Sequence, residues 1–220
     1  MKRLLLAVFT LAVSFSVAAG PFSKWESLFD GKSTDKWRAL GKPIFPAKGW
    51  VITNGVLRLE PKSDGGNLIS VDKYSEFDLE WEWRIGAKGN NGLKYFVIEE
   101  RGAIGHEYQM IDDTTVDQRK HATGSFYDVL PPVQGARAKK IGEWNKSRIR
   151  VQGNQVTHWL NGKRVLQYEL DSPELKSAIA KSKFKETKPF GSRIEGHIVL
   201  TDHHDEVSYR KIRIRRLSSK

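Results

Sequence analysis

The chain has 220 residues, with 37 Lys and Arg against 26 Asp and Glu, and 10% of its residues are aromatic. This length favours a single domain, and the aromatic content argues against an intrinsically disordered chain. The sequence contains no cysteine, which excludes disulfides, thiolate catalysis, zinc–cysteine sites and iron–sulfur clusters.

The N-terminal segment is typical of an export signal. Lys2 and Arg3 precede an apolar run over residues 4–17, and small residues at 18–20 suit a signal peptidase. The apolar run is shorter than the roughly 20 residues that a membrane-spanning helix needs. We therefore expect a signal peptide over residues 1–19 and an exported bacterial protein, periplasmic or secreted, without a stable membrane anchor.

Short stretches of alternating apolar and polar residues follow along the chain. The pattern is clearest at residues 77–84, where alternation with charged residues is typical of a strand with one buried face. Asn-Gly pairs at 54–55 and 161–162 favour type I′ hairpin turns, because both residue types tolerate a positive φ. Residues 147–168 are predicted to form a three-strand meander. The predicted strands are residues 51–53, 56–59, 68–71, 77–84, 93–99, 106–111, 124–127, 148–151, 156–160, 164–168, 194–200 and 207–214.

One helix is predicted after residue 172. Ser172 can cap it, Pro173 suits the first helical position, and Glu174 favours the positive end of the helix dipole. A dozen short strands with a single helix indicate an all-β sandwich, and we find no linker or internal repeat. We therefore expect one domain over residues 20–220.

The basic run from Arg210 to Arg216 raises nucleic acid as a possible partner. Isoleucine at positions 212 and 214 gives the run the period-two pattern of a half-buried strand. We therefore interpret the run as the solvated face of a sheet. Removal of Lys2 and Arg3 with the signal peptide would lower the formal charge from +11 to +9, so the protein would stay basic. Export would nevertheless keep it away from most nucleic acid, which disfavours nucleic acid as a partner.

Polar side chains gather on the predicted strand over residues 106–111. Alternation places Glu107 and Gln109 on one face, opposite Tyr108. Asp112 would join the Glu107 face only through a bulge after Gln109, a feature often found beside active sites. Such a row could bind a sugar and transfer a proton; the alternative is a solvated strand face that runs into a turn.

A second polar segment, residues 201–206, lies between two predicted strands and contains Asp202 and His203. Imidazole titrates near neutrality, so His203 could serve as a base, an acid or a metal ligand. The alternative is a plain hairpin loop, which we expect for residues 204–206.

Four other residues are weaker candidates. Arg84 could hold a sugar oxygen, although its position also suits a surface or cross-strand pair with glutamate. Lys94 and Tyr95 could supply a cation and a hydroxyl donor. His158 shares a strand face with apolar residues, so a hydrogen-bonded core histidine is as good an interpretation as a catalytic one.

Ten short segments occur in a specific order along nearly the whole chain after residue 20. They are Trp25–Lys32, Trp37-Arg38, Phe77–Arg84, Asn90–Tyr95, Glu107–Asp112, Thr123–Asp128, Gly142–Asn145, His158–Gly162, Ser182–Phe184 and Gly196–His203. In this order the chain resembles the bacterial 3-keto-disaccharide hydrolase domain family. The resemblance implies a concanavalin A-like jelly roll of two antiparallel sheets, and cleavage of glycosides oxidised to a ketone at sugar carbon 3. Thr201 stands where the family usually has glutamine, which removes an amide that could contact the substrate.

The implied chemistry makes specific demands on the site. A 3-keto group acidifies the proton on carbon 2, so a base can remove it and expel the group on carbon 1, and water then adds to the enone. Such a site needs a base, an acid and a cation or donor at the enolate oxygen. From the resemblance we hypothesise His203 or Glu107 as the base, Asp112 in support, and Arg84 or Lys94 at the oxyanion.

A bound divalent metal ion is the alternative to these cations, and its ligands could come from Glu107, Asp202, His158 and His203. The residues expected to bind the substrate are Arg84, Lys94, Tyr95, Gln109, His158 and Asp202. An oxidoreductase acting earlier would have to supply the ketone.

Two other functions stay open. The Glu107-x-Gln-x-x-Asp112 segment is similar in outline to the Glu-x-Asp-x-x-Glu strand of jelly-roll glucanases, which cleave ordinary glycosides with paired carboxylates. An amide in the middle and a shorter last carboxylate disfavour such a retaining glycosidase. A noncatalytic carbohydrate-binding module of the same fold is the second alternative.

Overall fold

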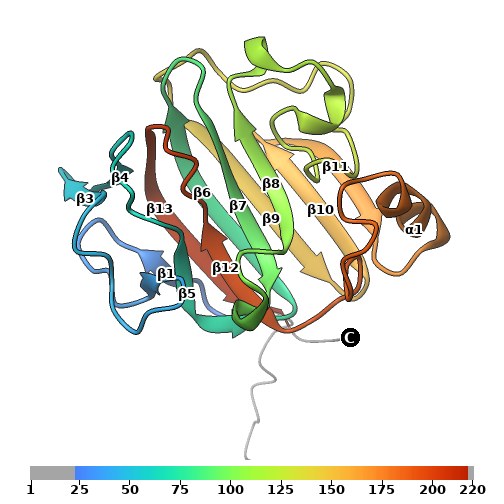
Figure 1. The fold of residues 1–220 in the computed structure, drawn as a ribbon, viewed down its shortest axis with the longest axis horizontal. Helices are drawn as coiled ribbons and strands as arrows, with labels where there is room; N and C mark the ends of the chain where they lie inside the picture. The colour runs from blue at the N-terminus through green and yellow to red at the C-terminus, as the bar shows by residue number, and fades with distance from the viewer. Residues whose placement is uncertain (1–22, 218–220) are drawn as a thin grey trace, which may run out of the picture.

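Two antiparallel β-sheets form the framework of residues 23–217, the part of the chain that the computed structural model describes (Figure 1). The larger sheet has eight strands in the order β11-β10-β9-β6-β13-β4-β3, with β1 paired to β13. The smaller sheet has five strands in the order β2-β5-β12-β7-β8. The predicted all-β sandwich is confirmed, whereas the predicted signal peptide lies outside the described residues.

The strands are β1 (Glu26–Phe29), β2 (Trp37–Ala39), β3 (Trp50–Thr53), β4 (Val56–Leu59), β5 (Leu68–Tyr74), β6 (Phe77–Ile85), β7 (Asn90–Val97), β8 (His106–Ile111), β9 (Asn145–Gln152), β10 (Gln155–Leu160), β11 (Lys163–Glu169), β12 (Gly196–Leu200) and β13 (Val207–Arg216). The helix α1 spans Pro173–Ala180, and three short 3₁₀ turns span Glu99–Arg101, Asp113–Thr115 and Arg119–His121.

The core lies between the inner faces of the two sheets. On β6, Leu79, Trp81 and Trp83 are buried, while the charged residues between them point to the outer face. Trp81 meets Tyr108 of β8 edge to face, with ring centroids 5.0 Å apart. Because the inner face of each strand is apolar, the outer faces of both sheets are left for polar and charged side chains.

The predicted hairpins form as expected. Asn54 and Gly55 have φ values of 52° and 76°, and Asn161 and Gly162 have φ values of 50° and 83°. Both residues of each pair are therefore left-handed, as a type I′ turn requires. Strands β9, β10 and β11 form the predicted meander.

The helix is also confirmed. The Ser172 hydroxyl accepts a hydrogen bond from the Leu175 backbone N–H at 3.1 Å, and Pro173 occupies the first helical position. Leu175 and Ile179, one turn apart, are buried against the core. Figure 1 shows α1 beside β10 and β11. No helix in residues 23–217 is long and apolar enough to cross a membrane.

The sequence prediction was wrong at residues 124–127, which are not a strand. Phe126 makes only isolated bridges, to Tyr108 and to Leu130. Gly124 and Asp128, with φ values of 84° and 63°, turn the chain at either end of the segment and prevent a longer ladder. Strands β1 and β2 were missed, because each is too short to show a clear alternation.

The basic run in β13 forms the outer face of the larger sheet, as predicted. Arg213 pairs with Glu80 at 2.7 Å and Arg210 with Glu82 at 2.6 Å, while Ile212 and Ile214 are buried. Asp78, at the start of the same strand as the two glutamates, lies fully buried among arginines.

Asp78 is the most buried charge of this face, so its removal tests how the sheet is held. Burial alone would raise the pKa of Asp78, but hydrogen bonds from Arg148, Arg150 and Arg215 lower the pKa to about 2. We expect Asp78→Asn to lower the free energy of unfolding by about 3 kcal/mol, because it leaves these arginines without their shared carboxylate.

Chemical denaturation of both proteins measures this loss. Asp72→Asn serves as the control, because the Asp72 side chain is 42% exposed and lies 3.8 Å from Lys36. It should change stability by less than about 0.5 kcal/mol. Equal effects of the two substitutions would contradict a structural role for Asp78.

Candidate active site

Glu107 lies on the outer face of the five-stranded sheet, as the second residue of β8. Its neighbour Tyr108 points into the core, so alternation turns Glu107 away from the larger sheet. Lys94 lies directly opposite on β7, with its Nζ 3.6 Å from Glu107 Oε2. On the other side, His203 Nε2 lies 3.8 Å from Glu107 Oε1. The structure therefore brings together three of the predicted site residues.

The Glu107 carboxylate packs directly against Gly92 of β7. A Cβ atom on Gly92 would be 2.0 Å from Glu107 Oε1 and 2.8 Å from Cδ. No side chain can fit there without moving the carboxylate. Position 92 therefore requires glycine because the Glu107 carboxylate occupies the space of a side chain, and not because of the backbone conformation.

The charge of Glu107 is set by its neighbours. Glu107 is only 4% exposed, and burial alone would raise its pKa, but the nearby His203, Lys94 and Lys183 more than offset burial and lower the pKa. The 3.8 Å separation from His203 is a close electrostatic approach that is too long for a direct hydrogen bond. Glu107 is therefore an ionised carboxylate at neutral pH.

His203 is held by the loop that follows β12, while its ring stays 41% exposed. Asp202 fixes this loop: its carboxylate accepts hydrogen bonds from the backbone N–H groups of Gly66 at 2.7 Å and His204 at 2.8 Å. Asp205 accepts from the Asn90 backbone N–H at 2.9 Å. Asp202 thus holds the backbone around His203, and each oxygen of the Asp202 carboxylate accepts one of these hydrogen bonds.

Tyr127 and Lys183 come from two loops and were not among the predicted site residues. The Tyr127 N–H donates to the Glu107 carbonyl at 3.0 Å, which places residue 127 along the free edge of β8. Lys183 Nζ lies 4.3 Å from the centroid of the Tyr127 ring. Asp128 ties the loops together by accepting from the Lys183 backbone N–H at 2.7 Å.

Gln109 lies on the Glu107 face, as predicted. Its amide donates to Asn90 Oδ1 at 2.9 Å, and the residue is 2% exposed. Gly92 is opposite Gln109 across β7 and β8. Gln109 therefore extends the polar row from Glu107 toward the end of the sheet where the His203 loop begins.

Asp112 does not join this row. The register between β7 and β8 runs without a bulge from Tyr95–His106 to Asn90–Ile111, so the bulge that Asp112 needed is absent. Its carboxylate instead accepts from the Lys88 and Thr114 backbone N–H groups at 2.9 and 3.0 Å. Asp112 caps a turn, which is the alternative that the sequence left open.

Arg84 is also far from Glu107, because it lies on the outer face of the other sheet. It follows Glu80 and Glu82 on β6, and its guanidinium lies 4.9 Å from the Trp144 ring centroid. The placement contradicts its assignment to the oxyanion beside Glu107. Local alternation gave the correct face of β6 but carried no information on which sheet holds the site.

Tyr95 and His158 lie in the core rather than at the surface. His158 donates from Nδ1 to the Gly124 carbonyl at 3.0 Å, so its Nε2 accepts from the Tyr95 hydroxyl at 2.9 Å. Tyr95 in turn accepts from Tyr168 at 2.6 Å, and Tyr168 accepts from His106 Nδ1 at 3.0 Å. At the far end of this hydrogen-bonded chain, the other ring nitrogen of His106, Nε2, accepts from the Gly191 N–H at 3.1 Å.

This buried chain links the two loops that carry Tyr127 and Lys183, because Gly124 belongs to one loop and Gly191 to the other. It assigns Tyr95 and His158 a structural task and contradicts their assignment to substrate binding. The four residues suggested as metal ligands do not converge either, because His158 is in the core and Asp202 holds backbone. Among residues 23–217 no group of three or more His, Asp or Glu side chains could hold a metal ion.

The fold is a concanavalin A-like jelly roll, and comparisons with other proteins show what class it belongs to. Porphyranase B from Zobellia galactanivorans has a similar fold, with a TM-score of 0.52 at 12% identity over 89% of this chain and 94% of that one. A candidate glycosyl hydrolase from Parabacteroides distasonis is more similar, with a TM-score of 0.78 at 27% identity over 88% of this chain and 94% of that one. The chain is a carbohydrate-acting hydrolase of jelly-roll fold.

The family follows from the sequence. Residues 24–215 match the model of the 3-keto-alpha-glucoside-1,2-lyase-like domain. A relative from Bacteroides thetaiotaomicron, named 3-keto-disaccharide hydrolase, is 32% identical over 225 aligned positions, which cover 86% of this chain and 77% of the relative. The protein belongs to this family, as the order of short segments predicted.

The buried histidines predict how stability depends on pH. Burial lowers the pKa of His106 to about 3 and of His158 to about 4. Between pH 6.5 and about 4 the unfolded chain therefore binds protons that the folded protein does not, so the free energy of unfolding falls as pH falls. His158→Gln should reduce this slope by up to about 1.4 kcal/mol per pH unit.

Denaturant unfolding at a series of pH values measures the slope. His204→Gln is the control, because the His204 side chain is 66% exposed; the slope should change less with this substitution than with His158→Gln. If His158→Gln leaves the slope unchanged, His158 is not held neutral in the folded state.

Proposed function

We propose that the protein cleaves 3-keto-glycosides by removing the proton on carbon 2. The electrons of that C–H bond form a double bond between carbons 1 and 2, and the bond from carbon 1 to the glycosidic oxygen breaks. Water then adds to the enone, with its oxygen at carbon 1 and its proton at carbon 2. The net reaction is hydrolysis, and no oxocarbenium ion is formed.

The observation that carries this proposal is the cluster of Glu107, Lys94 and His203 on the outer side of the smaller sheet. It combines an ionised carboxylate, an ammonium 3.6 Å away and an imidazole 3.8 Å away. Enolisation of a ketone needs a base next to a cation, and these groups provide both within one substrate's reach.

We assign His203 as the base, because its ring is the exposed member of the cluster. Its side chain is 41% exposed, whereas that of Glu107 is 6% exposed. The ionised Glu107 carboxylate would stabilise the imidazolium that forms when His203 takes the proton from carbon 2. Carboxylates beside catalytic histidines stabilise the imidazolium in this way.

Lys94 would stabilise the developing enolate oxygen, and Lys183 stands near enough to Glu107 to add to the same positive field. Tyr127 would give its proton to the leaving oxygen. Burial and the charge of Glu107 raise the pKa of Tyr127, so its hydroxyl keeps its proton at neutral pH and can act as a donor.

A retaining glycosidase is less well supported by the geometry. That mechanism requires two carboxyl groups about 5–5.5 Å apart across the glycosidic bond. Asp112, the second carboxylate that the sequence offered, binds the Lys88 and Thr114 backbone and Thr114 hydroxyl. Both of its oxygens are taken up in capping.

The proposal implies an oxidoreductase that forms the ketone earlier in the reaction sequence, because a simple glycoside has no acidic proton on carbon 2. We also propose export of the protein, from the charged start and apolar run of residues 1–20. Substrate and oxidoreductase would then meet this protein in the periplasm or outside the cell.

The test compares a 3-keto-disaccharide with the same disaccharide unoxidised, by mass spectrometry of purified protein. We expect monosaccharide release from the keto form alone. Glu107→Gln should reduce turnover by about 100-fold or more and still bind substrate, while the exposed Glu100→Gln control keeps wild-type turnover. Cleavage of the plain sugar would favour paired carboxylates, and binding without cleavage would favour a binding module.

Gly92→Ala provides a second test of the same site. The new Cβ displaces the Glu107 carboxylate, so we expect kcat on the keto-disaccharide to fall at least tenfold, since a displacement of 1 Å can cost about 100-fold. Gly86→Ala is the matched control, because a Cβ there meets nothing within 4 Å. Equal rates for the two variants would show that the place of Glu107 does not matter.

A further inference from the structure

The outer face of the larger sheet carries a second ordered array of charges, on the opposite side of the sandwich from Glu107. Asp78, Glu80 and Glu82 point outward from β6, which lies between β9 and β13. The flanking strands supply seven cations: Lys146, Arg148 and Arg150 from β9, and Arg210, Lys211, Arg213 and Arg215 from β13. We call these seven cations and three carboxylates the basic face.

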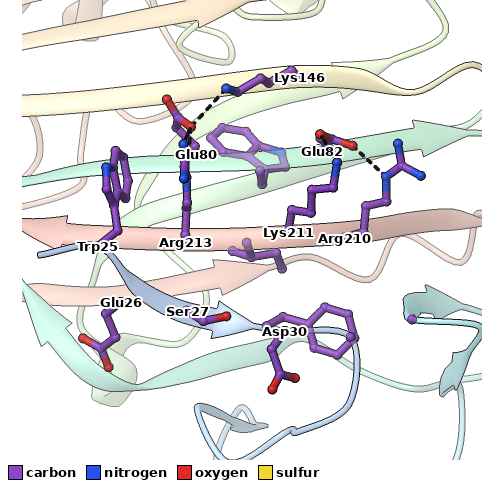
Figure 2. Close-up of a pocket in the computed structure, with 15 residues that line it drawn as sticks. Trp25, Glu26, Ser27, Asp30, Glu80, Glu82, Lys146, Arg210, Lys211 and Arg213 are labelled. Atoms are coloured by element: carbon purple, nitrogen blue, oxygen red, sulfur yellow. Dashed lines mark hydrogen bonds and ion pairs between the residues drawn. The ribbon is translucent and has the colours of Figure 1, made fainter.

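The carboxylates of the basic face lie beneath its cations. The side chains of Asp78, Glu80 and Glu82 are 0%, 12% and 19% exposed, whereas those of Lys146 and Lys211 are 54% and 68% exposed. Figure 2 shows Glu80 between Lys146 and Arg213, with Glu82 beside Arg210 and Lys211. A partner approaching this sheet therefore meets the exposed cations first. The basic face has four more cations than carboxylates, and Glu26 and Asp30 at its margin reduce this excess to two.

Two hollows mark the basic face and its margin. One, of about 680 Å³, is lined by Trp25, by the four cations Lys146, Arg210, Lys211 and Arg213, and by the four carboxylates Glu26, Asp30, Glu80 and Glu82. The other, of about 630 Å³, extends from Arg150 over β10 and β11. Strand β9 lines both hollows, the first through Lys146 and the second through Arg150. These residues are four positions apart, about 13 Å along a strand, so one extended chain could occupy both.

The second hollow offers neutral hydrogen-bonding groups as well as cations. Gln155, Thr157 and Gln167 line it together with Trp159 and Arg164. Amide and hydroxyl groups suit sugar hydroxyls, and a partly buried indole offers an apolar edge for a sugar ring. The combination of cations with such groups fits an anionic glycan better than a bare phosphate chain.

A membrane surface fits this face poorly. The large hydrophobic side chains that are exposed in the described chain are Ile44, Ile52, Val71, Ile104, Val133 and Ile141. None of them lies on β6, β9, β10, β11 or β13. Peripheral membrane binding combines charge with exposed apolar side chains that enter the lipid, and these strands carry none of the exposed large hydrophobic side chains.

We propose that the basic face is a noncatalytic binding site for a glycan chain that bears carboxylate or sulfate groups. The site is separate from the candidate active site and does not depend on the proposed reaction. Binding there would hold the enzyme on an acidic polysaccharide and raise its effective concentration near sugars released from that polymer.

Titration of the full mature protein with polygalacturonate, dextran sulfate and neutral dextran tests the proposal. We expect binding of one or both anionic polymers, weakening as salt rises, and none of neutral dextran. Polygalacturonate probes carboxylate groups and dextran sulfate probes sulfate groups. No binding of either anionic polymer at low salt would overturn the proposal, as would tighter binding of an oligothymidylate of matched charge.

Matched variants then separate this site from the general basicity of the protein. Replacing Lys146, Lys211 and Arg213 together by Gln should weaken binding about tenfold or more, since each exposed charge pair contributes up to a factor of about five. Replacing the exposed Lys176, Lys181 and Lys185 by Gln changes net charge equally and should alter affinity less than twofold. Equal losses in the two triple variants would overturn the proposal.

Two further readouts keep the test decisive. The basic-face variant should cleave a small keto-disaccharide at the wild-type rate, because none of its three positions touches Glu107, Lys94 or His203; a loss of this rate would contradict a separate site. If the triple variant fails to fold, Lys211→Gln alone, at a side chain 68% exposed, should still weaken binding two- to fivefold.

Discussion

A buried carboxylate with an ammonium and an imidazole beside it is the interaction on which the candidate active site depends. Glu107 is 4% exposed, and a charge so placed is tolerated only where other charges and hydrogen bonds compensate for lost water. Lys94 on the neighbouring strand and His203 in a loop supply this compensation, and Gly92 leaves room for the carboxylate. The position of each group is therefore coupled to the ionised state of one side chain.

The rest of the fold maintains this arrangement from a distance. Asp202 and Asp205 hold the backbone on both sides of His203, and Asp128 joins the loops of Tyr127 and Lys183. Beneath them, the donor chain between the two buried histidines connects the same two loops through the core. Because both histidines are neutral, this connection adds no charge to the interior, which helps to explain how a polar network is accommodated there.

The parts of this account that could be predicted from sequence are those that depend on local alternation. The outward direction of Glu107 and Gln109 follows from the period of one strand, and the same rule applied to β7 would have placed Tyr95 inside once Lys94 was outside. Arg84 was misassigned because alternation does not tell which sheet a strand joins. Tyr127 and Lys183 meet only through loops 56 positions apart, so no local pattern could connect them. Asp112 was misassigned because a capping aspartate and a catalytic one have the same sequence context.

Proton abstraction at carbon 2 is the central claim, and hydrolysis of a 3-keto-disaccharide in D₂O tests it most directly. The account predicts that the released 3-keto-sugar carries one deuterium on carbon 2, at a rate far above exchange of that sugar without enzyme. His203→Gln should abolish incorporation and cleavage together. Rapid cleavage with no deuterium on carbon 2 would contradict the account, because the bond would then have broken without removal of that proton.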